Sequence, residues 1–460
     1  MKLRRMLGLL ALGCGGAEAE AESVPVLDFE TQPSCPAADA TCLNAGTTTL
    51  DIDGVRVIHK PLPGHPLVSF RLAFDAPTGS GRQRWAETLA LSMFDLGGPR
   101  GLAPSDWDAE LVRLGASVAA GNGFDYGSIG ATAPVVTWRE LWDLVIQGIA
   151  QYRNYDFELE NRRGVYDLGI QSELDDPDSA ASIDAWSRLF QGHTYNYQRE
   201  YLDALAALSS VDIDAAWGAL SAGDRWLVSV VGDVGVDEIT AAIQEARGWV
   251  ARTGPGLVFQ PDLRVVPPAP PPVRVLDYPE APTWYIVGYF EGPGGNSPDF
   301  APLELGLTVL DQRLFDEVRD ARGLAYTTGA GLAFYRQSYG RVWITSESPL
   351  DALAVSRQIL TDLKTTGPTE AELEAARSAL VTRLLASNDT PSSIALTLAD
   401  WELTAGAREA LDHYLAALDQ ATPSDVAGVL AGYLRDVRIA AAGGGSPLAE
   451  SELETWFVSP

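Results

Sequence analysis

The sequence predicts an α+β fold of two similar domains, each an α/β roll in which helices pack against an antiparallel sheet. The chain has 460 residues, which is more than one ordinary core accommodates. A proline-rich stretch at 252–273 forbids regular structure and marks a domain boundary. On either side of it the hydrophobic pattern repeats one order: a strand pair, a helix, a second strand pair, several helices and a final strand. These observations indicate an internal duplication.

The N-terminal domain, 46–251, starts with two strand-like runs at 47–59 and 66–74, which a turn at Pro63-Gly64 joins. A helix follows at about 83–95, because apolar residues there recur at helical spacing: Trp85, Leu89, Met93 and Phe94. Ser105 is the expected N-cap of the next helix. The pattern then predicts strands within 116–133, long helices to about 220, a strand at 226–231 and a helix at 236–250.

The C-terminal domain, 274–445, is predicted to repeat this order. Its first helix should run from 302 to 320, with Gly323 as the C-terminal cap. The expected strands are at 273–277, 283–290, 326–335, 341–346 and 437–442. The expected later helices are at 349–364, 369–387, 391–405, 407–418 and 423–434. Residues 446–460 are interpreted as a C-terminal tail.

Residues 1–14 are interpreted as an export signal of the lipoprotein type. Basic residues at the start precede an apolar run at 6–13 that is too short to span a bilayer as a helix. Gly13-Cys14 after this run resembles the lipobox of bacterial lipoproteins, in which the cysteine is lipidated. An ordinary signal, cleaved within 17–22, is the alternative. We therefore expect an exported protein, held in the cell envelope by a lipid anchor only, or else secreted, with residues 15–45 as a tether.

Two further features of the composition limit the function. Cys35 and Cys42 lie close together in an exported chain, which favours a small disulfide loop over a metal site, since no histidine precedes His59. The formal net charge is −29, so the chain repels phosphate backbones and nucleic acid is not an expected partner. This charge could attract basic peptides, but acidic residues occur along the whole chain, so we interpret it as solubility.

Several short segments carry a family resemblance. The strongest is at 313–326, where Arg-Leu-Phe-Asp-Glu-Val-Arg is followed by Arg-Gly-Leu-Ala-Tyr at 322–326. Three more occur in the first half: Leu-Val-Arg-Leu-Gly-Ala at 111–116, Phe-Gln-Gly-His-Thr-Tyr at 190–195 and Val-Val-Gly-Asp-Val at 230–234. In order and spacing they resemble landmarks of the insulinase (pitrilysin, mitochondrial processing peptidase) zinc peptidases. The resemblance covers roughly 45–445 and implies a metallopeptidase-like duplication.

The resemblance implies a zinc site from which this chain departs. The family binds zinc through an inverted H-x-x-E-H motif and a later glutamate, and the motif glutamate is the general base. Here Arg84 and Thr88 stand where the histidines belong, and only Glu87 remains. The later glutamate falls on Gly169, although a slipped register would bring in Glu173. We expect this chain to bind no metal or other cofactor, and Arg84 and Glu87 to form an i,i+3 ion pair.

The second half keeps two residues that the resemblance implies are functional. Arg319 and Tyr326 have the spacing of the arginine and tyrosine that the family places over the zinc, where they bind the substrate carbonyl and stabilise the intermediate. The alternatives are a solvated Arg319 paired with Asp316 or Asp320, and a Tyr326 that is an ordinary strand residue.

The resemblance therefore implies the non-catalytic subunit type of this family. In such pairs a zinc-bearing paralogue supplies Zn²⁺ and the general base, and the other chain supplies the arginine and tyrosine. Whether the protein is an enzyme stays open, because it should be inactive alone. The expected substrate is an extended peptide that lies along a sheet edge. The alternative is a catalytically inactive homologue that binds peptides or acts as a scaffold.

Overall fold

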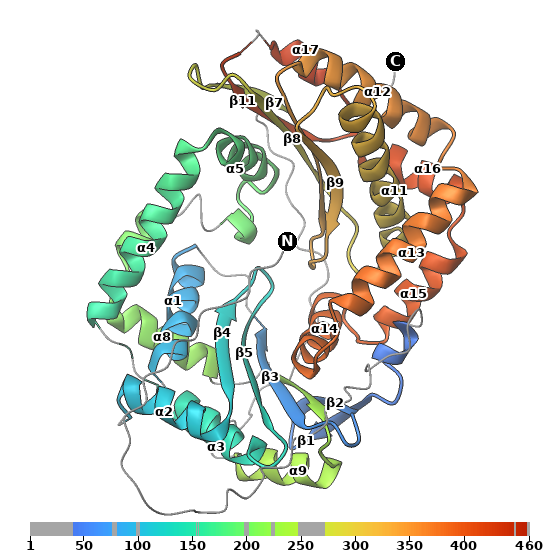
Figure 1. Ribbon diagram of the computed structural model, residues 1–460. Helices are drawn as coiled ribbons and strands as arrows, with labels where there is room; N and C mark the ends of the chain where they lie inside the picture. The colour runs from blue at the N-terminus through green and yellow to red at the C-terminus, as the bar shows by residue number, and fades with distance from the viewer. Residues whose placement is uncertain are drawn as a thin grey trace, which may run out of the picture. The chain divides into compact units, whose positions relative to one another are not determined.

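The structure is a computed structural model, and it describes most of the chain after residue 39 (Figure 1). The predicted signal with Cys14, most of the tether with Cys35, and nearly all of the proline-rich linker lie outside the described residues. The described residues are 40–75, 81–97, 102–152, 154, 156–196, 202–221, 226–246, 272–445 and 448–457.

The first half contains a six-stranded sheet with the order β1-β2-β6-β3-β5-β4. Strand β6 lies inside the sheet and is buried at every position, as its Val-rich sequence predicts. Strand β4 is at one edge, so one side of its backbone has no strand partner in this sheet. The strands are β1 (Thr48–Ile52), β2 (Val55–Pro61), β3 (Leu67–Asp75), β4 (Ser117–Asn122), β5 (Tyr126–Pro134) and β6 (Trp226–Gly232).

Two local predictions in this half are wrong. The single strand expected at 47–59 is the hairpin β1–β2, because Asp53 and Gly54 both have positive φ angles, 53° and 82°, which suit a tight hairpin turn. The helix expected to be capped by Ser105 has Ala103 at its N-cap and Pro104 in its first turn. Proline suits that position because it has no N–H to leave unpaired and its φ is already helical.

Helices cover this sheet on the side where the first core lies. Helix α1 buries Trp85, Leu89, Met93 and Phe94, as the helical spacing predicts. The helices and 3-10 turns of this half are α1 (Gly81–Gly97), α2 (Pro104–Leu114), α3 (Trp138–Ala150), α4 (Asp156–Asp175), α5 (Pro177–Leu189), η2 (Thr194–Asn196), α7 (Leu202–Ala206), α8 (Ser210–Ser221) and α9 (Val236–Glu245).

The second half contains a five-stranded sheet with the order β7-β11-β8-β10-β9. In both sheets the last strand of the half pairs in parallel with one neighbour and antiparallel with the other. Five strands of the first sheet therefore follow the topology of the second, which confirms the predicted fold class. The strands are β7 (Val273–Asp277), β8 (Trp284–Glu291), β9 (Thr327–Ala333), β10 (Tyr339–Ser346) and β11 (Arg438–Gly443).

The helices of the second half agree closely with the predicted ranges. The first is α-helical in α11 and continues as a π-helical segment, η3, before Gly323 ends it with a left-handed φ of 63°. The elements are α11 (Phe300–Arg313), η3 (Leu314–Asp320), α12 (Pro349–Thr365), α13 (Glu370–Ala386), α14 (Pro391–Thr404), α15 (Ala410–Gln420), α16 (Pro423–Tyr433) and α17 (Glu450–Glu454). None of the described helices is both long and apolar enough to cross a membrane.

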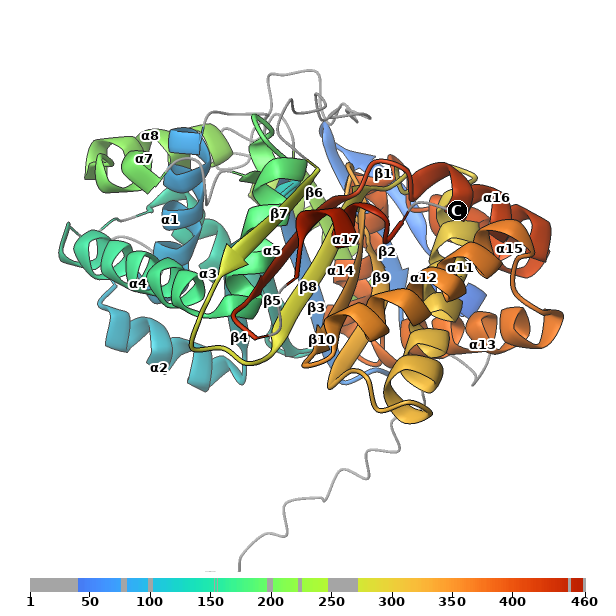
Figure 2. The same cartoon turned by 90° about the horizontal axis from the view of Figure 1, so that it is seen from above.

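The two halves exchange a helix. Helix α14 of the second half packs on β3 and β6 of the first sheet, where Leu398 and Ile394 meet Ile58 and Val231. Helix α5 of the first half packs on β8 and β11 of the second sheet (Figures 1 and 2). Each exchanged helix covers the sheet face opposite to that sheet's own helices. Both sheets are therefore covered on two faces, and neither half closes its core alone.

Both ends of the described chain pack against the core, at residues 40–43 of the expected tether and 448–457 of the expected tail. In 446–460, Trp456 is 1% exposed, and its indole Nε1 donates to Ser356 Oγ at 2.8 Å. In 15–45, the short η1 (Ala40–Leu43) buries Leu43 against the exchanged helix region. Cys42 is disulfide-bonded, and Lys60 Nζ donates to its carbonyl oxygen at 2.8 Å. The buried apolar residues in 40–43 and 448–457 explain why these parts pack against the core.

Candidate functional site

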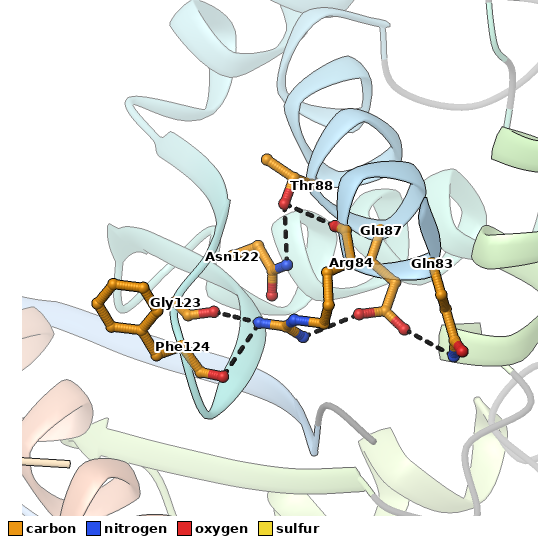
Figure 3. Close-up of polar contacts among 7 residues, drawn as sticks. All are labelled: Gln83, Arg84, Glu87, Thr88, Asn122, Gly123 and Phe124. Atoms are coloured by element: carbon orange, nitrogen blue, oxygen red, sulfur yellow. Dashed lines mark hydrogen bonds and ion pairs between the residues drawn. The ribbon is translucent and has the colours of Figure 1, made fainter. Parts of the chain in front are cut away.

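Helix α1 places the residues of the degenerate zinc motif on its buried face (Figure 3). The side chains of Arg84 and Glu87 are each 1% exposed, and Arg84 Nη1 donates to Glu87 Oε2 at 2.9 Å. This is the i,i+3 ion pair that the spacing predicts. Arg84 Nη2 also donates to the carbonyl oxygens of Gly123 and Phe124, the latter at 3.1 Å. The guanidinium therefore ties α1 to the turn between β4 and β5.

The neighbouring polar side chains complete this network. Thr88 Oγ1 donates to the Arg84 carbonyl oxygen at 2.8 Å and accepts from Asn122 Nδ2 at 3.1 Å. Gln83 Nε2 donates to Glu87 Oε1 at 3.3 Å. Figure 3 shows that these contacts join the first turns of α1 to the end of edge strand β4. All three motif positions, 84, 87 and 88, are thus engaged with the polypeptide itself.

The charges of this network are arranged around the buried carboxylate. Burial raises the pKa of Glu87, while the Arg84 charge and the hydrogen bonds from Gln83 and Arg84 oppose that rise. A buried ion pair adds little net stability, because both groups lose hydration. Removal of one partner is costly, since it leaves the other charge buried and uncompensated. The pair therefore fixes the position of α1 against β4 and β5.

The side chains at this place do not fit a zinc ion. Zinc takes histidine nitrogen, cysteine sulfur or carboxylate oxygen, whereas a guanidinium has only donors and repels a cation. Glu87 is the one group of the three that could ligate, and it is bound to Arg84. Within the described residues, no three or more His, Cys, Asp or Glu side chains are placed to hold a metal. We therefore assign no metal chemistry to this helix.

Helix α4 carries the position of the later glutamate. It packs on α1 through Tyr166, whose ring meets the ring of Trp85 edge-on at 5.2 Å. Gly169 is exposed, and a Cβ placed there would contact nothing within 4 Å. Glu173, one turn further on, is also exposed. The structure therefore does not place a buried carboxylate from these positions beside Glu87.

Arg319 and Tyr326 lie on the surface of the second half. The Arg319 side chain is 46% exposed; its guanidinium lies 4.6 Å above the Phe315 ring, and its Nε is 3.9 Å from Asp320 Oδ1. Tyr326 is 80% exposed, and its backbone N–H donates to the Thr345 carbonyl oxygen at 2.8 Å. The turn at Gly323 holds the two residues on one segment. Both face solvent, whereas Arg84 and Glu87 are buried in the other half.

Residues 220–380 match the protein family described as "Peptidase M16 inactive domain". Two similar curated proteins are both called uncharacterized zinc proteases. One from Mycobacterium tuberculosis is 32% identical over 121 residues, and one from Mycobacterium leprae is 25% identical over 302 residues. The matches cover 25% and 62% of this chain, and 27% and 65% of these relatives, so the chain spans less than two thirds of their length. Residues 220–380 are therefore similar to an M16 peptidase domain.

Solved structures of M16 proteins share its fold. A crystal structure described as a peptidase M16 inactive domain, from Pseudomonas fluorescens, is 17% identical with a TM-score of 0.74, and the match covers 88% of this chain and 99% of that one. The periplasmic protease PqqL from Escherichia coli is 14% identical with a TM-score of 0.72; the match covers 95% of this chain and 49% of that one. This chain therefore has the fold of about one half of that longer chain.

The structure also has a cavity that the sequence did not predict. Its volume is about 680 Å³, and it lies between edge strand β4, the following turn at 123–126, and the residues 333–335 with helix α14 of the second half. Tyr126 donates its hydroxyl proton to Asp400 Oδ1 across this boundary. Asp400 comes from the exchanged helix, and no sequence pattern indicates which sheet that helix covers.

A second carboxylate holds the turn beside the cavity in place. Asp125 is 4% exposed and accepts a hydrogen bond from the Tyr195 hydroxyl on Oδ1. Its Oδ2 accepts from the backbone N–H of Arg336 at 2.8 Å. Burial raises the pKa of Asp125, and these hydrogen bonds oppose the rise. Both oxygens are engaged, so Asp125 joins the β4–β5 turn of the first half to the β9–β10 turn of the second.

Proposed function

We propose that this M16 homologue is the non-catalytic, substrate-binding subunit of a heterodimeric zinc peptidase that acts on peptides in the cell envelope. The zinc ion and the general base come from a paralogous partner chain. Arg319 and Tyr326 come from this chain and reach the partner's site. The lipoprotein-type signal with Cys14 supports the envelope location, since a lipidated cysteine would attach the chain to a membrane.

The observation that carries the proposal is the contrast between the two halves. The place of the zinc motif is filled by the Arg84–Glu87 pair, whose side chains are 1% exposed. Arg319 and Tyr326, by contrast, are open to solvent at 46% and 80%. An arginine and a tyrosine hydroxyl that serve a site in another chain must be on the surface. They can then bind a substrate carbonyl and stabilise the charge that develops on it.

Two further observations support a partner and a peptide. The chain has the fold of about half of PqqL, so two such units together would have the size of that protease. Strand β4 is an edge strand whose outer backbone groups have no partner strand in the sheet. An extended peptide can add to such an edge through main-chain hydrogen bonds. The peptide would then lie beside the turn that Arg84 fixes.

The first test recovers the complex. The tagged chain is purified in mild detergent, its partners are identified by mass spectrometry, and the eluate is assayed for peptide cleavage that a chelator abolishes. We expect a related chain with an intact H-x-x-E-H motif and chelator-sensitive cleavage. Arg319→Ala and Tyr326→Phe should each lower kcat by about 10²- to 10³-fold with the complex intact, because each removes a donor to the developing charge.

The matched control is Arg322→Ala. Arg322 lies on the same segment and is exposed, with its Nη2 4.0 Å from Glu317. Its loss should leave cleavage unchanged if position, rather than positive charge alone, matters. Full cleavage by the Arg319→Ala complex would contradict the proposed role.

The second candidate function is a scaffold that binds peptides and takes no part in cleavage. The Arg84–Glu87 pair favours it, because this chain keeps α1 in place without any metal. Recovery of the chain with unrelated proteins, and no cleavage, would support this function over the first.

A further inference from the structure

We infer that the cavity between β4 and α14 is a subsite for the basic side chain of a bound peptide, with Asp400 as its counter-ion. This inference rests on the proposed binding of peptides along β4. The cavity volume of about 680 Å³ is in the range of small-ligand sites, and one wall is the edge strand itself. A side chain of a peptide on that edge could therefore enter the cavity.

Two acceptor oxygens of residues that line the cavity have no hydrogen-bond donor among the described residues. Asp400 Oδ1 accepts from the Tyr126 hydroxyl, while no contact of Oδ2 is found with any described residue. Asn122 uses its Nδ2 to donate to Thr88, but its Oδ1 is buried without a partner among the described residues. A carboxylate oxygen and an amide oxygen can only accept here. A ligand that satisfies Asp400 Oδ2 must bring N–H donors, as an arginine or lysine head group does.

The charges near Asp400 come from three elements packed around it. Tyr126 of β5 holds one carboxylate oxygen, Asp125 of the β4–β5 turn adds a second negative charge, and Arg71 of β3 adds a positive one. Arg71 donates through Nη1 to Ser128 at 2.8 Å and makes no ion pair with Asp400. Asp400 is therefore an oriented carboxylate that lies near the Arg71 charge but makes no ion pair with a described residue.

The walls of the cavity suit a cation with an apolar stem. Phe124 and Tyr126 of the first half, and Phe334 and Tyr335 of the second, line it. The faces of aromatic rings attract cations, and the stem of an arginine or lysine packs well on them.

The experiment compares fluorescent peptides of equal length that carry arginine, citrulline or glutamate at one position. The full chain is titrated with each, and Kd is measured by anisotropy. We expect the arginine peptide to bind about 10- to 100-fold more tightly than the citrulline peptide, which keeps the shape but has no charge. Asp400→Asn keeps the size of the side chain and should abolish the difference. Asp351→Asn, an exposed carboxylate on α12, is the matched control and should preserve it.

The pH dependence of peptide binding by the wild-type chain provides a second test, which needs no variant. Burial raises the pKa of Asp400 to about 6, so its carboxyl becomes protonated as the pH falls from 7.5 to 5. The preference for arginine over citrulline should shrink over this range. A preference that does not change with pH would count against Asp400 as the counter-ion, even if Asp400→Asn fails to fold.

The remaining outcomes separate this inference from the proposed function. Equal binding of arginine and citrulline peptides would refute the subsite and leave peptide binding in place. Arginine amide is the second probe, measured by calorimetry with the wild type and Asp400→Asn. Asp400-dependent binding of arginine amide without binding of any extended peptide would support the subsite and refute the proposed function. Absence of binding of every probe would refute both.

Discussion

The two halves share a strand order but use the helix that follows β3 in the first half, and β8 in the second, in opposite ways. In the first half, α1 buries Arg84 and Glu87 against the turn after edge strand β4. In the second half, the corresponding α11 continues as the π-helical η3 and leaves Arg319 and Tyr326 exposed before edge strand β9. Short π-helical segments are frequent at functional sites. The contrast indicates that the first half uses this helix to pack against its sheet, whereas the second half exposes an arginine and a tyrosine at the end of it.

The largest effect should come from the loss of the buried cation. Arg84→Ala leaves Glu87 buried without its partner, which should lower the free energy of unfolding by about 3–5 kcal/mol. Because burial already raises the pKa of Glu87, the variant can protonate this group. The destabilisation should therefore be larger at pH 8 than at pH 5. Urea denaturation at the two pH values measures it.

Two variants sharpen that result. Arg82→Ala removes an exposed arginine one position from the helix start, which pairs with Asp212 at 2.9 Å, and should cost less than about 1 kcal/mol. The double substitution Arg84→Met, Glu87→Leu removes both buried charges and should recover much of the lost stability. If Arg84→Ala costs no more than Arg82→Ala, the buried pair does not fix α1.

The fold was largely predictable because the spacing of apolar residues in each half clearly indicates its helices and strands. Strand β7 and helices α12 to α16 lie at the expected positions within a few residues. The hairpin at Asp53-Gly54 was missed because its apolar residues continue across the turn. The packing of α14 on the first sheet could not be predicted. An amphipathic pattern shows that a helix buries one face, but not which sheet it covers.

The candidate site was predictable only in part, for the same reason. The absence of histidines at 84 and 88 is visible in the sequence, and so is the ion-pair spacing of Arg84 and Glu87. The contact of Arg84 with Gly123 and Phe124 joins residues about 40 positions apart and needs the tertiary structure. Asp400 and Tyr126 lie 274 positions apart, so no local pattern relates them.

The next largest effect on stability should come from a substitution in the exchanged helix α14. Leu398 is 1% exposed in α14, and Leu398→Ala should lower the free energy of unfolding by about 2–4 kcal/mol. Since α14 belongs to the second half but packs on the first sheet, both halves should lose stability together. Hydrogen exchange of β6 and β11 amides would report this. Leu350→Ala, at a site that is 45% exposed, is the control and should change little. Destabilisation confined to β11 would argue against the exchange.

Substitution of Asp400 should have a smaller effect on the free energy of unfolding, and this effect should depend on pH. Burial raises the pKa of Asp400 from 3.8 to about 6, so the folded state favours the protonated carboxyl. The stability that this protonated group contributes is fully present below about pH 4, and it is lost as the pH rises through 6. Asp400→Asn cannot ionise. The variant should equal the wild type near pH 4 and exceed its free energy of unfolding by about 1–2 kcal/mol at pH 7.5. Such a gain would fit a carboxylate kept for binding at a cost in stability. An equal difference at both pH values would show that Asp400 does not titrate differently on unfolding.

The smallest effects on stability should come from the exposed pair. Tyr326 is 80% exposed and its hydroxyl makes no hydrogen bond with the described residues, so Tyr326→Phe should change the free energy of unfolding by less than about 0.5 kcal/mol. Arg319→Ala loses its contact with the Phe315 ring and should cost up to about 1 kcal/mol. Thermal and urea denaturation measure both. A large destabilisation by either variant would make them structural residues like Arg84. Unchanged stability means that any loss of cleavage in the assembled complex reflects chemistry at a partner's site and not unfolding of this chain.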